Sequence, residues 1–91
     1  MPIISGTIVR VEPVETGTDK KGKDFSRQRF IVEVVDGNHV KKICLTAWND
    51  MQRRMAKYAI GSPIEVDTNI ESRQVNDKWY TDIKPWRILE D

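Results

Sequence analysis

Basic side chains gather in one short stretch of the sequence, where they could contact phosphate groups. Between residues 20 and 29 the chain has five cations and one acid, Asp24, a local charge of +4 (five minus one), whereas the formal net charge of the whole chain is +1. The five cations are Lys20, Lys21, Lys23, Arg27 and Arg29. Because the near-neutral total gives no general attraction for a polyanion, this clustering is what favours nucleic acid. The alternative for the KKGK run is a solvated loop.

Aromatic side chains accompany these cations. Proteins bind single strands without sequence preference through cations that follow the phosphates and aromatic faces on which bases stack. Phe25 lies where the basic loop meets the next predicted strand, and Trp48 ends the strand after it. We expect Trp48 to face outward on a binding surface; the alternative is that it plugs the end of a barrel. Trp79, beside Lys78, either forms a second wall of the site or belongs to the core.

Two further cations are candidate phosphate contacts. We expect Lys42 to share the outward face of its strand with Trp48, next to the two arginines of the neighbouring strand. Arg73 precedes the last predicted turn, close to Lys78. A surface ion pair between Arg73 and Glu71 or Asp82 is the alternative, and such a pair contributes little to stability.

The sequence offers little for catalysis or metal binding. It has one histidine, His39, and one cysteine, Cys44, so it can form no internal disulfide and no four-ligand zinc site from these groups. We place His39 in a turn and Cys44 within a strand as a small filler. Asp67 and Glu71 are interpreted as surface charges. We therefore expect a protein that is not an enzyme and has no metal or cofactor.

The remaining pattern predicts a mainly β protein with one domain over residues 1–91. Nine valines and ten isoleucines stand against two leucines, and β-branched side chains favour strands. A flexible loop is expected over residues 16–24, and one short helix is expected to begin at an Asn49 cap and to end at Gly61. The predicted strands cover residues 3–14, 27–35, 39–48, 64–73 and 79–88.

Alternation along these strands predicts which side chains are buried. Trp48 should face outward, Met51, Met55 and Tyr58 should cap one end of the barrel, and Tyr80 and Trp86 are interpreted as packing residues. The side chains expected to face inward are Ile43, Leu45, Ala47, Ile64, Val66, Thr68 and Ile70. Those expected to face outward on the fourth strand include Glu65, Asp67, Asn69, Glu71 and Arg73.

The order of three strands, one helix and two strands matches the five-stranded Greek-key barrel known as the OB-fold. In OB-folds the face of strands two and three, with its flanking loops, binds oligonucleotides or oligosaccharides. The sequence has no run of the roughly 20 apolar residues that a membrane-spanning helix needs, so we expect a cytoplasmic protein. The apolar MPIIS segment could pair with a second copy as an edge strand, which makes a homo-oligomer an expectation to test.

The residues also carry a family resemblance. The stretch from Val40 to Ile88 resembles the second half of bacterial single-stranded DNA-binding proteins, with Trp48, Tyr58, Gly61 and the segments IEVDTNIESR and Tyr80-Thr81-Asp82 at the matching features. More closely, GTIVRVEP, KKICLTAW and ESR…KWYTDIKPWRI resemble a small family of gut-type bacteria and their phages, catalogued as a domain of unknown function and regarded as an OB-fold. The bacterial proteins usually carry a Gly/Pro/Gln-rich tail that recruits replication partners; residues 1–91 contain no such segment, and we do not expect recruitment through a tail.

Residues and resemblance together predict a non-enzymatic module that binds single-stranded DNA in replication, recombination or repair. RNA is a second ligand to consider, since stacking and phosphate contacts do not inspect the 2′-hydroxyl. The alternative from another class is an OB-fold subunit for protein–protein interaction or assembly.

Overall fold

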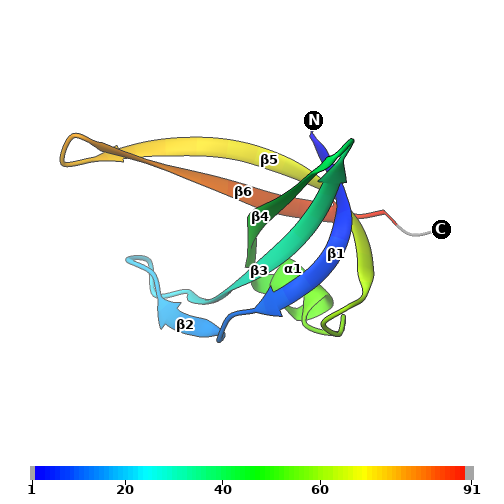
Figure 1. Cartoon of the computed structure of the whole chain (residues 1–91). Coiled ribbons are helices and arrows are strands. Elements are labelled where there is room, and N and C mark those ends of the chain that lie inside the picture. The colour runs from blue at the N-terminus through cyan, green and yellow to red at the C-terminus, as the bar shows by residue number, and fades with distance from the viewer. Residues whose placement is uncertain (1, 90–91) are drawn as a thin grey trace.

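The computed structural model describes residues 2–89; Met1, Glu90 and Asp91 lie outside the described residues. Six strands and one short helix follow one another along the chain (Figure 1). They are β1 (Ile3–Val11), β2 (Glu15–Thr18), β3 (Asp24–Asp36), β4 (His39–Trp48), α1 (Asn49–Met55), β5 (Pro63–Val75) and β6 (Lys78–Ile88). The mainly β fold with one helix between the third and fourth long strands is confirmed.

The strands form one antiparallel sheet in the order β4-β3-β1-β5-β6, with β2 paired to the start of β3. β1 passes from one partner to another, since its first half pairs with β5 and its second half with β3. Gly6 permits this crossing, because a Cβ there would lie 2.3 Å from the Glu33 carbonyl oxygen. Within residues 2–89, β6 lies beside β4 without a hydrogen-bonded ladder, so the barrel stays open at this seam.

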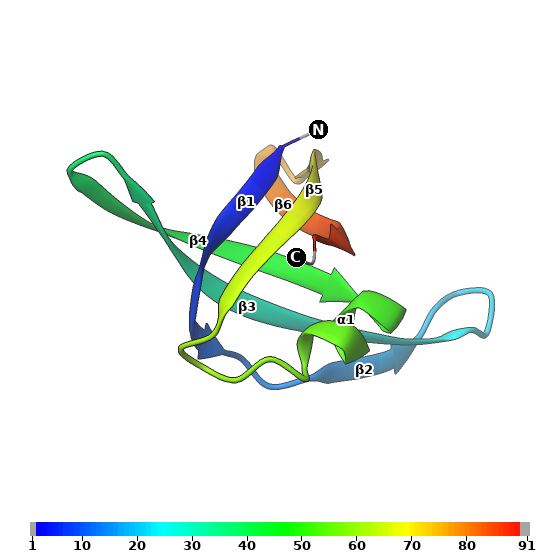
Figure 2. The same cartoon turned by 90° about the vertical axis from the view of Figure 1, so that its right-hand side faces the viewer.

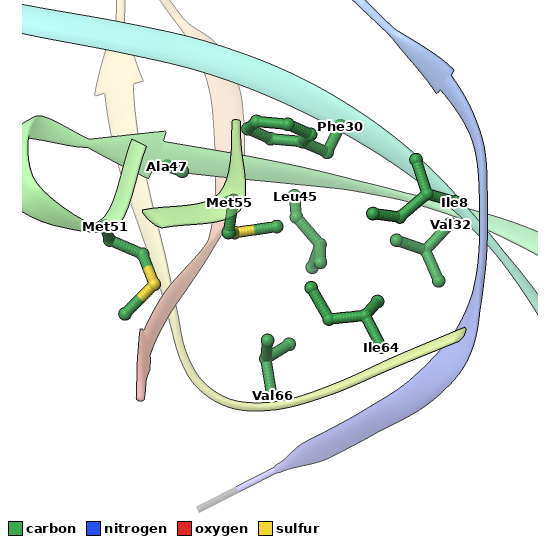
Figure 3. Packing of buried hydrophobic residues seen from close by; sticks show 9 residues of the cluster. All are labelled: Ile8, Phe30, Val32, Leu45, Ala47, Met51, Met55, Ile64 and Val66. Atoms are coloured by element: carbon green, nitrogen blue, oxygen red, sulfur yellow. The ribbon is translucent and has the colours of Figure 1, made fainter. Parts of the chain in front are cut away.

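The core lies between the curved sheet and α1 (Figure 3). It is formed by Ile8, Phe30, Val32, Leu45, Ala47, Met51, Met55, Ile64 and Val66. The inward prediction is therefore confirmed for Leu45, Ala47, Ile64 and Val66. Two methionines of α1 close one end of the barrel, and the partly buried Tyr58 packs against them, as the helical spacing predicted.

Two hairpins extend beyond this core. The β2–β3 and β5–β6 hairpins project to the same side of the molecule (Figure 1). The β2–β3 and β3–β4 turns lie at opposite ends of the molecule (Figure 2). Residues 16–24, predicted as a flexible loop, instead contribute β2 and the first residue of β3, because Thr18 pairs with Asp24 across a turn. We call these hairpins the basic arm (β2–β3, residues 15–27) and the aromatic arm (β5–β6, residues 70–83).

Several of the burial predictions for β5 and β6 are wrong. Ile70, expected to face inward, is 52% exposed, because this part of β5 runs past the end of the core. Tyr80 and Trp86, interpreted as packing residues, are exposed as well. In the other direction, Asp67 was expected at the surface but is buried, with Arg87 Nη2 3.7 Å from its Oδ2.

The start of the helix also differs from the prediction. Trp48 occupies the N-cap position and makes no side-chain cap bond, whereas Asn49 has a left-handed backbone (φ 53°). The Asn49 side chain instead accepts a 3.0 Å hydrogen bond from the Ser26 backbone N–H, so it ties α1 to β3. The helix ends at Met55, well before Gly61. In residues 2–89, no helix has the length and apolar character needed to cross a membrane.

Candidate nucleic-acid interface

The register between β3 and β4 sets the geometry of the candidate site. Arg27 pairs with Trp48, Arg29 with Thr46, and Glu33 with Lys42. Directly opposite residues of an antiparallel pair share a face of the sheet. The predicted placement of both arginines, Trp48 and Lys42 on one outer face is therefore confirmed, with Lys42 further along the sheet than the other three.

Trp48 is the centre of a cluster on this face. Its ring lies 5.6 Å from the Phe25 ring at an interplanar angle of 50°. The Arg27 guanidinium carbon lies 5.3 Å from the Trp48 ring centroid and the Lys84 Nζ lies 5.5 Å from it. Trp48 is half-buried, so it is neither a freely exposed platform nor a buried plug of the barrel. Its Nε1 is buried without a hydrogen-bond partner among residues 2–89.

Carboxylates neutralise the cations of this cluster. Glu15 pairs with Arg27 directly across the β2–β3 ladder, and the two side chains form an ion pair. The other oxygen of Glu15 lies 3.8 Å from Arg29 Nη1. The hydrogen bond from Arg27 holds the pKa of Glu15 below its usual value, so the carboxylate is charged at neutral pH. Lys84 also has a carboxylate partner, since its side chain forms an ion pair with Glu71.

The three lysines of the basic arm lie at its tip, away from the Trp48 cluster. The turn is held by Asp19, whose Oδ1 accepts hydrogen bonds of 2.9 Å from the backbone N–H groups of Lys21 and Lys23. Lys20, Lys21 and Lys23 are exposed, and no ion pair is recorded for them within the described chain. The structure therefore separates these three lysines from Arg27 and Arg29, which the sequence presented as one cluster.

The tip of the aromatic arm holds the remaining candidates. Trp79 is 67% exposed, so the core alternative for this residue is wrong. Lys78 is exposed beside it. Arg73 Nη1 lies 3.4 Å from Asp82 Oδ2, which is the ion pair considered as the alternative to a phosphate contact. The Arg73 guanidinium also lies 5.9 Å from the ring centroid of Tyr80.

The sequence matches a known protein family over almost its whole length. Residues 3–89 match the family described as "Domain of unknown function (DUF3127)". The chain belongs to this family. The predicted resemblance to an OB-fold domain of unknown function is thereby confirmed. No curated protein matches the sequence.

Three solved structures show the fold that this DUF3127 domain adopts. The second OB-fold domain of replication protein A from Methanococcus maripaludis has a TM-score of 0.67 and 19% identity, over 94% of this chain and 78% of that one. The SSB domain of a Synechococcus protein has a TM-score of 0.65 and 12% identity, over 98% and 92%. A small single-stranded DNA-binding protein from Streptomyces coelicolor has a TM-score of 0.50 and 16% identity, over 99% and 92%. At these identities, the likeness establishes the OB-fold.

Sequence reasoning missed several residues of the DUF3127 domain that now belong to the candidate site. Lys84 was overlooked because the irregular pairing around Pro85 obscured which face it shares. Tyr80, Asp82 and Lys84 alternate along β6, and this signal could have placed them on one face. Glu15 was overlooked because β2 contains no apolar side chain that would mark it as a strand.

The remaining reactive groups lie apart from this cluster or are chemically quiet. Cys44 lies on β4 with an exposed side chain; neighbouring residues still desolvate its thiol in part, which raises its pKa and disfavours the thiolate. His39 is exposed at the start of β4. Within residues 2–89, no group of three or more His, Cys, Asp or Glu side chains could hold a metal ion. A surface pocket of about 810 Å³ lies beside α1, and the residues that line it include Arg54, Lys57 and Tyr58.

Proposed function

We propose that this domain is a non-enzymatic module that binds single-stranded DNA, and that it serves replication, recombination or repair. The observation that carries the proposal is the Trp48 cluster, in which an indole ring lies among two cations and a second aromatic ring on the outer face of β3 and β4. Bases stack on such rings without sequence preference, while cations contact the phosphates. OB-folds commonly bind oligonucleotides on the face of their second and third strands, which correspond to β3 and β4 in this chain.

The two arms extend this surface in the proposal. The lysines of the basic arm would contact phosphates. Lys78 and Trp79 lie on opposite faces of the tip of the aromatic arm, so a strand that passes around this tip would contact both. Arg73 and Lys42 complete the proposed set at its edges. Each phosphate that the protein neutralises should contribute about −0.7 to the slope of log K against log salt concentration.

The first experiment is a titration of intrinsic tryptophan fluorescence with an unlabelled dT oligomer of about 20 nucleotides at low salt, followed by back-titration with NaCl. We expect quenching that salt reverses. An equal titration with an oligo-rU of the same length measures the preference between DNA and RNA. Absence of any change at micromolar protein and low ionic strength would contradict the proposal.

Trp48→Ala tests whether the cluster is the site. Removing one stacked base should weaken binding of a labelled dT oligomer by about tenfold, since stacking contributes about 1 to 3 kcal/mol per base. Trp86→Ala is the matched control, because it removes an indole that lies outside the cluster. The guanidinium carbon of Arg87 lies 5.4 Å from the centroid of the Trp86 ring. Circular dichroism must show that both variants are folded, and Trp48→Phe should retain most of the affinity. Equal affinity of Trp48→Ala and wild type would exclude the cluster as the site.

A second candidate function is protein–protein interaction, and one face of the aromatic arm favours it. This face carries no charged side chain between residues 70 and 83; alternation places on it Ile70, Ser72, Gln74, Trp79, Thr81 and Ile83. Exposed Trp79 and Ile70 on such a face are typical of a surface that contacts a partner. Binding of this kind would persist in high salt and would be insensitive to loss of the basic-arm lysines.

A further inference from the structure

Glu15 forms ion pairs with Arg27 and Arg29, two of the cations that would contact phosphate in the proposed function. Its carboxylate bridges Arg27 and Arg29, one oxygen to each guanidinium. Strand pairing fixes this arrangement, because Glu15 and Arg27 are directly opposite each other in the β2–β3 ladder. The carboxylate is therefore held at the arginines by the fold and does not reach them by chance from a mobile loop.

Arg27 is confined from two sides. The Trp48 ring lies on one face of its guanidinium and Glu15 binds its terminal nitrogen. Its Nε is buried and has no hydrogen-bond partner among residues 2–89, and the same holds for Trp48 Nε1. Two donors beside the ion pair thus lack acceptors in the described chain, while one terminal nitrogen of Arg27, Nη2, is bound to Glu15.

The basic arm contrasts with this arrangement. Within residues 2–89 its three tip lysines have no carboxylate partner, whereas each cation next to the Trp48 ring has one: Glu15 for Arg27 and Glu71 for Lys84. Carboxylates therefore neutralise the cations around the Trp48 ring, where bases would stack. A phosphate that approaches the stacking centre meets paired cations, and a phosphate at the arm tip meets free ones.

Phosphate and carboxylate are alternative anionic acceptors for the same guanidinium donors. We propose that Glu15 is an intramolecular competitor of the ligand: a strand phosphate must displace its carboxylate from Arg27 and Arg29 before these arginines contribute to binding. This inference rests on the proposed function and adds a residue that limits affinity at the same site. The displaced carboxylate remains part of the protein beside the strand, so the gain from each new phosphate contact is reduced by the loss of the ion pair with Glu15.

Glu15→Gln tests the competition, because glutamine keeps the shape of the side chain and loses its charge. We expect binding of a labelled dT oligomer to tighten about two- to fivefold at 0.1 M salt, which corresponds to a partly exposed ion pair. The slope of log K against log salt concentration should become steeper by about 0.7 to 1.4, for one or two newly available phosphate contacts. Thermal melting checks that the variant is folded.

Two further variants separate local pairing from total charge. Glu65→Gln makes the same change in net charge at an exposed position on β5 that forms no ion pair with any other residue of the described range 2–89. It should change affinity by less than about 1.5-fold. Glu15→Asp keeps the charge but shortens the reach to the arginines, so its affinity should lie between those of wild type and Glu15→Gln.

The outcomes distinguish this inference from the proposed function. If wild type binds the oligomer and Glu15→Gln binds equally or more weakly, the competition is overturned while the DNA-binding proposal stands. If neither protein binds at low salt, both are overturned. Binding by Glu15→Gln together with weak or absent binding by wild type would support the competition strongly.

Discussion

The two arms are both antiparallel hairpins on the same side of the molecule, yet they present different chemistry. The basic arm exposes three lysines at its tip, and its aromatic residue, Phe25, contacts Trp48. The aromatic arm exposes Trp79 and Tyr80 and has one lysine, Lys78, at its turn. Free lysines are therefore concentrated on the basic arm, and exposed aromatic rings on the aromatic arm. Salt weakens contacts of the first kind and has little effect on the second, so each arm can be measured independently.

The turns explain why the arms differ. In the basic arm, Asp19 accepts backbone hydrogen bonds and Gly22 adopts a left-handed backbone (φ 83°), so the lysine side chains have no structural role. In the aromatic arm, Asn76 and Asp77 both have positive φ (50° and 67°), typical of a two-residue hairpin turn that keeps twisted strands paired to the end. The long paired strands then expose both faces of the arm.

The largest expected effect comes from removing the charge of the basic arm. The triple change Lys20→Ala, Lys21→Ala and Lys23→Ala should reduce the salt slope by about 2, which corresponds to about 100-fold weaker binding at 0.1 M salt if the contacts contribute nothing at 1 M. Fluorescence titrations of a dT oligomer at several salt concentrations measure both quantities. Lys57→Ala, in the segment that follows α1 and outside both arms, serves as the single-site control. An unchanged slope would remove the basic arm from the site.

A substitution on the aromatic arm should have a smaller effect on affinity and should leave the salt dependence of binding unchanged. Trp79→Ala should weaken binding about tenfold through loss of one stacked base, and the slope should remain that of wild type. Trp79→Phe should restore much of the loss. If the affinity of Trp79→Ala for DNA equals that of wild type, the uncharged face of this arm would be better explained as a surface for a protein partner.

The smallest expected effect is the coupling between the arms. Because the two arms do not contact each other in the part of the chain that the structure describes, the losses of binding free energy in the triple lysine variant and in Trp79→Ala should add to within about 0.5 kcal/mol in the combined variant. The measurement is a double-mutant cycle on the same oligomer at one salt concentration. A larger coupling would mean that the arms close around the strand together.

Much of the fold follows from alternation along the strands. Buried Leu45, Ala47, Ile64 and Val66 and outward Arg27 were predictable, since one face of each strand must supply the core. The exposure of Ile70 was not, because alternation does not reveal where a strand leaves the core. The pairing of Glu15 with Arg27 depends on the register of a strand without apolar residues, and register is weakly specified in such a strand.

A small polar network at the root of the basic arm has a thermodynamic consequence. Ser26 Oγ and Gln28 Oε1 both bond to the side chain of the buried Gln52 at 2.9 Å, and Gln28 Nε2 donates to the Glu12 carbonyl at 2.8 Å. These bonds fasten β3 to the helix immediately beside Arg27 and Trp48. At the proposed binding surface a ligand would therefore meet a backbone that is already held in place, so little backbone entropy would be lost there on docking. A glutamine of α1 that faces the interior of the protein would thus help to set the rigidity of the proposed binding surface.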